Sequence, residues 1–204
     1  MISKLYLPDV TLFAIDACNI KGILRAVEIC QRRIEFGNVV VINERLFPGD
    51  TLQQGREGYS KFMIKELHKY ITTSHALTIH HDGFIQNPYA WTDEWLKLDY
   101  IGAPWEWYED KKVGNGGFSL RSKRLCEILA KDDKIDKFMP EDDMICRHYH
   151  DYLVETYGIK YGTVEQARRF SIEGWAVSPE ERKYNGQFGF HSPWPTDLPI
   201  PINE

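Results

Sequence analysis

Three short polar clusters in this chain combine residue types that can bind a metal ion and move a proton. They are His80-His81-Asp82-Gly83, Asn115-Gly116-Gly117 and Glu141-Asp142-Asp143. Imidazole and carboxylate together suit Mn²⁺, Zn²⁺ or Fe²⁺, whereas carboxylates with phosphate oxygens suit Mg²⁺ or Mn²⁺. Because side chains alternate along a strand, His80 and Asp82 are expected on one side of it and His81 on the other. Asp82, together with His80, is therefore a candidate divalent-cation site. The alternative is a hydrogen-bonded turn aspartate beside a packed histidine.

The acidic cluster follows Pro140, where a helix is expected to begin. Carboxylates in a first helical turn are stabilised by the helix dipole, and such acidic starts are common without any function. An ionised carboxylate at this position can also take a proton from an alcohol. Since side chains within one turn point in different directions, one of the three is expected to face a pocket.

The Asn115-Gly116-Gly117 cluster opens an apolar segment. Two glycines let the backbone approach another group closely. After an asparagine they predict contact with the hydroxyls of a ligand, or else a tight turn. His191 stands between aromatic residues and Pro193, a setting that by itself is typical of a structural histidine.

A βαβ unit at the start of the chain is expected to position these clusters. Residues 10–15 and 39–42 are apolar, β-branched runs typical of buried parallel strands, and residues 20–33 have helical spacing. Such a unit crosses over right-handed, and ligands of such sheets bind beyond the carboxyl ends of the strands. The polar residues expected at that edge are Asp16, Asn19, Asn43 and Glu44. No G-x-G-x-x-G follows the first strand, so the dinucleotide fingerprint is absent.

The remaining pattern predicts further strands and helices around the clusters. Strands are expected at residues 76–79, 100–103 and 118–120, and helices at residues 122–131 and from Pro140 through Leu153. The fold class is therefore α/β, with a nucleotide-binding βαβ half followed by a mixed sheet with flanking helices. One domain is expected over residues 1–191, followed by a Pro-rich tail over residues 192–204.

Composition narrows the class of protein. The chain has 204 residues, enough for one domain, and its net charge of −5 gives no electrostatic footprint for non-specific nucleic-acid binding. The sequence leaves open the alternative of a local basic face formed by Lys111, Lys112, Arg121, Lys123 and Arg124. None of the four cysteines forms a C-x-x-C pair, so a reducing compartment is expected. Without a signal-peptide core or an apolar run of membrane length, a cytoplasmic protein with no membrane span is expected.

Six motifs that include these clusters occur in a defined order. They are Asp82-Gly83, Tyr100-Ile101-Gly102-Ala103-Pro104-Trp105, Gly114-Asn115-Gly116-Gly117-Phe118-Ser119-Leu120-Arg121, Pro140-Glu141-Asp142, Phe170-Ser171-Ile172-Glu173 and Phe188-Gly189-Phe190-His191. The string resembles the DUF5672-type family of GT-A-like glycosyltransferases over about residues 59–191. The resemblance implies a single GT-A-like domain that transfers a sugar from a nucleotide-sugar donor, its co-substrate, to an acceptor hydroxyl.

The chain is also similar to the inverting galactosyltransferases of the GT-A fold. Those carry Asp-x-Asp at a strand end, a Gly-Gly strand, a Glu-Asp-Asp helix start and a late metal-binding histidine. By position, Asp82 matches the last Asp of Asp-x-Asp, and His80 stands where the first would be. The resemblance thus implies a Mn²⁺ or Mg²⁺ ion at Asp82, His191 and His80.

The same resemblance assigns the other roles by position. The residues expected in catalysis are Asp142, as the general base, and Glu141 and Asp143, which orient the sugar or acceptor. Those expected to bind the donor are Asp16, Asn43, Glu44, Tyr59, Lys61, His81, Asn115, Gly116 and Gly117. Those expected to bind the acceptor, by stacking on a ring, are Trp105 and Trp107.

Two other functions remain open at this point. A metal-dependent hydrolase built on His80, Asp82 and His191 is one, although the chain has neither G-x-S-x-G nor H-E-x-x-H. A non-catalytic carbohydrate-binding domain of the same fold is the other, which the aromatic content of 13% permits. The acceptor is open between a glycan, a lipid, a small molecule and a hydroxylated DNA base, and the oligomeric state is open as well.

Overall fold

The structure, a computed structural model, describes residues 4–16, 18–42, 55–174 and 184–191. The predicted Pro-rich tail at residues 192–204 lies outside them. The elements are β1 (Leu5–Ile15), α1 (Ile20–Arg33), β2 (Ile34–Ile42), α2 (Gly55–Lys65), η1 (Leu67–Tyr70), β3 (His75–Ile79), η2 (Pro88–Ala90), η3 (Asp93–Lys97), β4 (Tyr100–Gly102), β5 (Phe118–Ser122), α3 (Lys123–Lys131), α4 (Glu141–Asp143), η4 (Met144–His148), α5 (His150–Tyr157), α6 (Val164–Phe170), β6 (Ser171–Glu173) and β7 (Gly189–His191).

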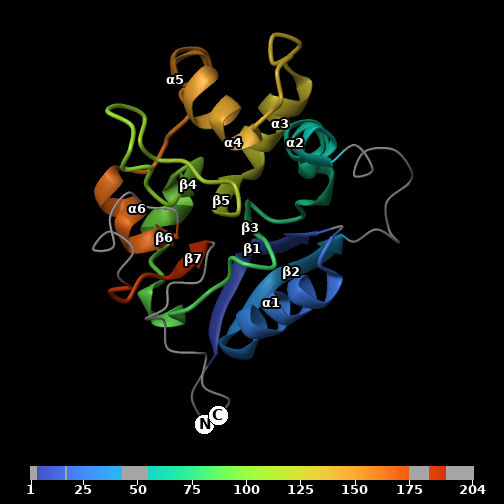
Figure 1. Ribbon diagram of the computed structural model, residues 1–204, viewed down its shortest axis with the longest axis vertical. Helices are drawn as coiled ribbons and strands as arrows, with labels where there is room; N and C mark the ends of the chain where they lie inside the picture. Colours follow the sequence, from blue (N-terminus) through green and yellow to red (C-terminus); the bar gives the residue numbers. More distant parts are fainter. Residues whose placement is uncertain (1–3, 17, 43–54, 175–183, 192–204) are drawn as a thin grey trace.

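A mixed five-stranded sheet in the order β2-β1-β3-β5-β4 forms the centre of the fold (Figure 1). Strand β1 runs parallel to β2 and β3, whereas β5 runs antiparallel to β3 and β4. The carboxyl ends of β1, β2 and β3 therefore meet at one edge. Because β5 runs the other way, its first residue, Phe118, pairs with Ile79 at the end of β3. This antiparallel pairing brings the glycines before Phe118 to the edge that carries His80.

Strand β1 is buried on both of its faces. Leu12 and Ala14 belong to the core shared with α1, whereas Phe13 and Ile15 belong to a second core with α2. Full burial on both faces explains why residues 10–15 read as an unbroken apolar run instead of an alternating one. The α/β class with flanking helices is confirmed.

Strand β2 begins earlier than its predicted start at residue 39. It runs from Ile34, directly after α1, through Gly37. Ile34 and Phe36 are buried and Glu35 is exposed, which is the period of a strand. A side chain at Gly37 would collide with the Pro8 carbonyl, where the register of β1 and β2 shifts. Gly37 thus accommodates a bulge within the strand.

The long helix predicted from Pro140 is interrupted. Helix α4 passes into the π-helical turn η4, where the Tyr149 amide bonds the Met144 carbonyl five residues back, before α5 begins. The Tyr149 hydroxyl accepts hydrogen bonds from the backbone amides of Asp136 and Lys137. A π turn contains one extra residue, which changes the direction of the side chains that follow it. In this chain the Tyr149 hydroxyl, at the end of the turn, bonds the helix to the preceding loop.

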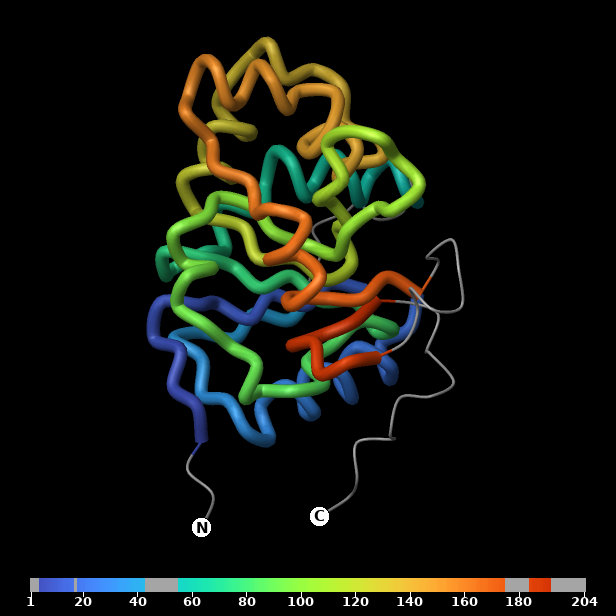
Figure 2. The backbone as a smooth tube through the Cα atoms, turned by 90° about the vertical axis from the view of Figure 1, so that its left-hand side faces the viewer, coloured from blue at the N-terminus to red at the C-terminus, as the bar shows by residue number. Residues whose placement is uncertain are grey.

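A small parallel ribbon pairs β6 with β7 (orange and red in Figure 2), and β7 contacts β5. Gly189 packs on the Phe118 ring, and Ile85 bridges to Gly189. This packing carries His191, the last residue of β7, to the edge of the sheet where β3 ends. Within the described residues, no helix is both long enough and apolar enough to cross a membrane.

Candidate active site

Three side chains capable of binding a metal ion converge at the end of β3. One ligand atom each from His80, Asp82 and His191 lies within 4.8 Å of the other two. The distance between His191 Nε2 and Asp82 Oδ1 is 3.7 Å. The two histidines come from segments 111 residues apart in sequence, and their rings are 5.6 Å apart at the centroids. The described fold thus brings together the three predicted side chains, two imidazoles and one carboxylate, and their role as metal ligands stays a prediction.

The far nitrogen of the His191 ring is held by a buried carboxylate. Nδ1 lies 3.2 Å from Glu173 Oε2, and the Asn115 amide donates to the same oxygen. Burial disfavours a charged imidazole, yet the bond to Glu173 and the charges of Glu173, Asp82 and Asp142 raise the pKa of His191 above its ordinary value. A carboxylate at Nδ1 fixes the ring so that Nε2 faces Asp82, which is the usual support of a metal-binding histidine. The site therefore favours positive charge at Nε2.

His80 is held in the opposite electrostatic sense. Burial, followed by the neighbouring His191, lowers its pKa to about 3, so the ring is neutral at physiological pH. Its Nε2 is 2.7 Å from the Tyr59 hydroxyl. A metal ion at Nδ1 requires the tautomer whose Nε2–H donates to the Tyr59 oxygen. Tyr59, predicted to bind the donor, thus orients one of the predicted metal ligands.

The two glycines before β5 make room for protein side chains of the site itself. A Cβ at Gly117 would overlap His191 Nε2, and one at Gly116 would overlap Glu141 Oε1. The Gly117 carbonyl also accepts a hydrogen bond from the His80 amide at 3.1 Å. Both glycines are therefore required by close packing within the site. Their predicted contact with a sugar stays a prediction.

The acidic helix start directs one carboxylate toward this glycine strand. The Gly116 amide donates to Asp142 Oδ2 at 2.9 Å, and the Asp143 amide donates to Oδ1 at 3.0 Å. Two backbone donors hold the Asp142 carboxylate in one orientation, at partial exposure. Asp143 points toward Tyr108 and Arg147, and burial and the Asp142 charge raise its pKa. The three side chains do point in different directions, as one turn requires.

Glu141 turns inward, to a residue that the sequence did not identify as part of the site. Its Oε1 accepts from the Arg121 guanidinium at 3.1 Å, and the two residues, Glu141 and Arg121, are 5% and 0% exposed. Burial and the Asp142 charge raise the pKa of Glu141 to about 7, against the attraction of Arg121. Arg121 also lies over the Tyr100 ring at 5.3 Å.

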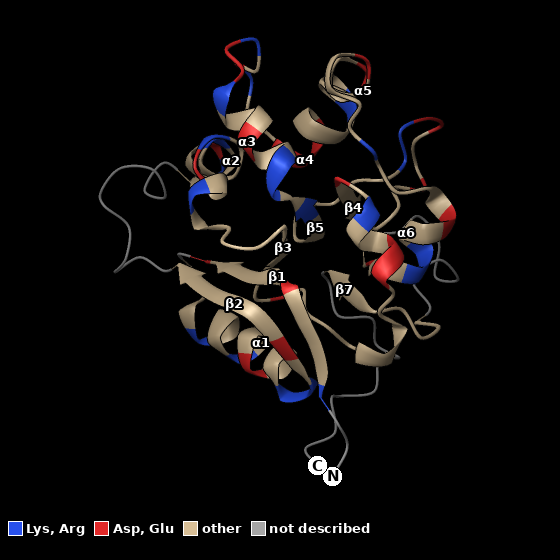
Figure 3. Cartoon of the chain, turned by 180° about the vertical axis from the view of Figure 1, so that it is seen from behind, with Lys and Arg blue, Asp and Glu red and all other residues tan. Residues whose placement is uncertain are grey.

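The predicted basic face is therefore wrong at Arg121, because this side chain is a buried counter-ion behind the site. Along the described chain, both signs of charge are interspersed on helices such as α1 and α6 (Figure 3). Arg121 and Glu173 are the two residues that sequence reasoning left without a role in the site. Both belong to the ordered motifs, Glu173 as the last residue of Phe170-Ser171-Ile172-Glu173, and that position was the available signal.

The chain segments that follow β1 and β3 are joined by one short contact between side chains. Asp16 Oδ2 lies 2.6 Å from His81 Nδ1, while Oδ1 accepts from the amides of Cys18 and Asn19. This brings two of the predicted donor-binding residues together. Lys61 is exposed on α2. Asn43 and Glu44 lie outside the described residues.

The two tryptophans predicted to bind the acceptor differ in exposure. Trp105 is 5% exposed and its ring covers Gly114, whereas Trp107 is 43% exposed. Their ring centroids are 6.4 Å apart. Trp107 is therefore the ring that is exposed enough to stack on a ligand, whereas Trp105 is a buried neighbour of that ring.

The mixed sheet and its flanking helices have the arrangement of the GT-A fold. A glycosyltransferase involved in the glycosylation of the major capsid of PBCV-1 matches with a TM-score of 0.52 and 16% identity, over 89% of this chain and 91% of that one. At that identity the likeness shows the fold alone.

Two structures of LgtC are also similar in shape. An active-site mutant of LgtC matches at a TM-score of 0.45 and 16% identity, over 94% of this chain and 91% of its own. The galactosyltransferase LgtC in complex with donor and acceptor sugar analogs matches at 0.47 and 15%, over 93% and 90%.

The chain belongs to the family described as Protein of unknown function (DUF5672), whose model matches residues 42–191. The resemblance drawn from the ordered motifs is thus confirmed. No curated protein matches the sequence.

Proposed function

We propose that this protein is a glycosyltransferase that moves a sugar from a nucleotide-sugar donor to an acceptor hydroxyl with inversion. The observation that carries the proposal is the convergence of His80, Asp82 and His191 beside a glycine strand that also holds Asp142. A cation site next to an oriented carboxylate is what the departure of a diphosphate and the deprotonation of an alcohol require. The GT-A fold of the chain is in agreement.

The residues present fit a divalent cation. His191 is fixed through Nδ1 by Glu173, Asp82 supplies an oxygen, and the neutral His80 has a second nitrogen. Mixed imidazole and carboxylate ligands suit Mn²⁺, Zn²⁺ or Fe²⁺, and of these Mn²⁺ also suits the phosphate oxygens of a diphosphate. When bound, the ion would neutralise charge on the diphosphate leaving group. Asp16 and His81, at the same edge, are the proposed contacts of the nucleotide, together with Tyr59, Lys61, Asn43 and Glu44.

In the proposed reaction Asp142 takes the proton of the acceptor hydroxyl. The acceptor oxygen then forms a bond to the anomeric carbon as the bond from that carbon to the phosphate oxygen breaks. The electron pair of the broken bond leaves with the nucleoside diphosphate. Because the base and the leaving group lie on opposite faces of the sugar, the anomeric centre inverts. The backbone donors of Gly116 and Asp143 hold the Asp142 carboxylate in one orientation, which supports its proposed role as the base.

The direct test is a donor-hydrolysis and transfer screen across nucleotide sugars, with and without Mn²⁺. We expect at least one donor to be turned over in a Mn²⁺-dependent manner. The Asp142→Asn variant should keep donor binding and lose transfer by about 10²- to 10⁴-fold, the usual contribution of a general base. Transfer by Asp142→Asn at the wild-type rate would show that the base has been assigned wrongly.

A metal-dependent hydrolase is the second candidate, because its three proposed ligands also converge. The two functions differ in the fate of the sugar. A hydrolase releases free sugar from the substrate whether or not an acceptor is present, whereas a transferase gives a glycosylated acceptor that mass spectrometry detects. Stabilisation by a nucleoside diphosphate with Mn²⁺ in a thermal-shift assay favours the transferase. Stabilisation by free sugar alone would favour a carbohydrate-binding domain.

A further inference from the structure

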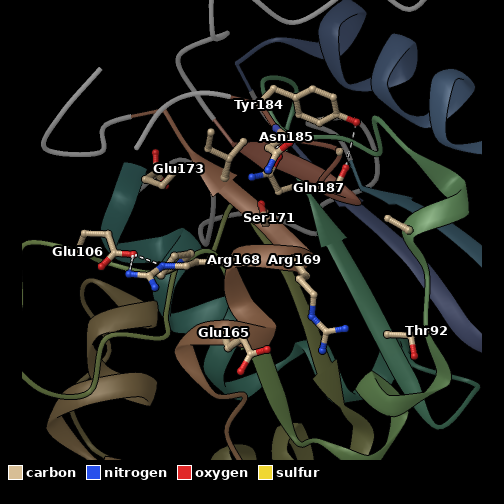
Figure 4. A pocket seen from close by; sticks show the side chains of 14 residues that line it. Thr92, Glu106, Glu165, Arg168, Arg169, Ser171, Glu173, Tyr184, Asn185 and Gln187 are labelled. Carbon is tan, nitrogen blue, oxygen red and sulfur yellow. Dashed lines mark hydrogen bonds and ion pairs between the residues drawn. The ribbon is translucent and has the colours of Figure 1, made fainter. Parts of the chain in front are cut away.

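A pocket of about 900 Å³ adjoins the candidate metal site (Figure 4). It lies between α6, β6, the segment before β7 and the loop after β4. Glu173 belongs to both places, because it lines the pocket and also bonds His191 and Asn115. Two hydrogen bonds therefore link the pocket to the proposed base: Asn115 donates to Glu173, and the amide of the next residue, Gly116, donates to Asp142.

The floor of this pocket contains a hydroxyl group without a partner. Ser171 is 1% exposed, and its Oγ accepts or donates no hydrogen bond among the described residues. In Figure 4 it lies in the middle of the lining, between Arg168 and Arg169 on one side and Asn185 and Gln187 on the other. A buried hydroxyl left unpaired is unfavourable, and a ligand hydroxyl that bonds it removes that cost.

The rest of the lining selects the chemistry of the ligand. The side chains labelled in Figure 4 are all polar, and both signs of charge are present. Arg168 is already paired with Glu106 at 2.7 Å. A polyanion such as a nucleic acid needs a surplus of basic groups, and a lipid chain needs apolar walls. The described lining has three glutamates against two arginines, so it lacks a basic surplus, and its apolar residues Ala90, Pro104 and Ile172 lie among polar side chains. Fixed donors and acceptors beside such small apolar patches suit the hydroxyls and C–H faces of a neutral sugar.

We propose that this pocket binds the acceptor of the reaction, and that the acceptor is a neutral oligosaccharide. The volume is in the range of about 300–1,000 Å³ that is usual for ligand sites. Glu106, which lines the pocket, directly precedes the exposed Trp107. Trp107 is not part of the pocket lining, and the proposal assigns its exposed ring to stacking on a further sugar. The role as acceptor site rests on the proposed function, whereas the binding of an oligosaccharide does not.

Binding to an array of immobilised neutral oligosaccharides, measured without donor or metal, tests the pocket alone. Wild-type protein is expected to bind at least one of them. Asn185→Trp, at the exposed rim, and Ser171→Ala, on the floor, should each weaken that binding about tenfold, a factor that corresponds to about 1.4 kcal/mol. Gln31→Trp, at another exposed polar residue, on α1, is the matched control and should bind as wild type does. In the transfer assay the same two pocket variants should raise the acceptor KM more than the donor KM.

Three results would overturn the proposal. They are absence of binding to every oligosaccharide, binding that neither pocket variant weakens, and tighter binding to single-stranded DNA or phosphatidylcholine vesicles than to any oligosaccharide. Failure of the proposed function has a different signature. A protein that binds an oligosaccharide through Asn185 and Ser171 but turns over no nucleotide sugar would refute the transferase and retain the binding site.

Discussion

A single methyl group at Gly117 is predicted to remove His191 from the metal site. A Cβ there would lie 2.0 Å from His191 Nε2, well inside the 3.0 Å that real Cβ atoms respect. The backbone of Gly117 is tied to the His80 amide, so the imidazole is the group that must move. The φ angle of Gly117 lies outside the left-handed region, so alanine adds no backbone strain. Because metal–ligand distances tolerate only about 0.2 Å, the displaced Nε2 no longer binds.

The size of the effect follows from linkage. Disturbing the support of a metal ligand costs about 10- to 100-fold in affinity, and losing the ligand costs at least the upper end of that range. At a Mn²⁺ concentration of about 100 times Kd, the wild type gains about 2.7 kcal/mol, which raises Tm by roughly 5–10 °C for a chain of this size. A variant that binds about 100-fold more weakly gains only about 0.4 kcal/mol at the same concentration, a shift of about 1 °C.

The assay is thermal unfolding with and without Mn²⁺ for wild type, Gly117→Ala, His191→Ala and the double variant. If the methyl group acts through the imidazole, the double variant should lose no more of the Mn²⁺ shift than His191→Ala alone, because the two changes remove one interaction. Independent, additive losses in the double variant, or a shift of wild-type size in Gly117→Ala, would refute the reasoning.

Two further predictions concern stability. The pKa of Glu141 is about 7 in the folded protein, against an ordinary value of 4.5, so the folded state binds this proton more tightly than the unfolded state does. The resulting contribution to the free energy of unfolding is fully present below pH 4.5 and is lost as the pH rises through 7. It amounts to roughly 3 kcal/mol, and urea unfolding between pH 4.5 and 8 should show a decline in wild type that Glu141→Gln lacks; parallel curves would contradict the raised pKa. Ser122 caps α3, because its hydroxyl accepts a hydrogen bond from the Leu125 amide at 3.0 Å and donates one to Asp99 at 2.6 Å. Ser122→Ala should therefore lower the free energy of urea unfolding by about 1–3 kcal/mol and leave turnover unchanged. A loss below about 0.5 kcal/mol would show that the cap is dispensable.

Local sequence patterns predicted the elements whose signals are local. Helix α1 has the predicted bounds, Ile20–Arg33, because its apolar residues recur with the helical period over fourteen positions. The β3 strand and α3 differ from prediction by one residue at an end. Strand β2 begins at Ile34, earlier than its predicted start at residue 39. A glycine is needed at position 37 because a side chain there would collide with the Pro8 carbonyl of the neighbouring strand. Such a contact between strands leaves no pattern in the local sequence.

The same distinction holds within the site. Asp82, His191, Asn115 and Asp142 were found from residue types in ordered motifs, and their proposed roles remain predictions. Arg121 was taken for part of a basic face, since nothing in the sequence around it marks a charge as buried. It is buried because β5 lies inside the sheet, where the guanidinium is compensated by Glu141.

By itself, the sequence determined the α/β class, the family and a set of residues able to bind a metal ion and take a proton. These properties depend on periodicity and on motif order, which are carried by the chain alone. Only the tertiary structure decided that His80, Asp82 and His191 meet, and that Glu173 holds the far side of His191. The reason is that β7 reaches the end of β3 through packing on β5, by contacts between segments far apart in sequence. Because of those contacts, the short sequence His80-His81-Asp82, a weak signal by itself, becomes part of a cluster in which His191 is held in place by Glu173.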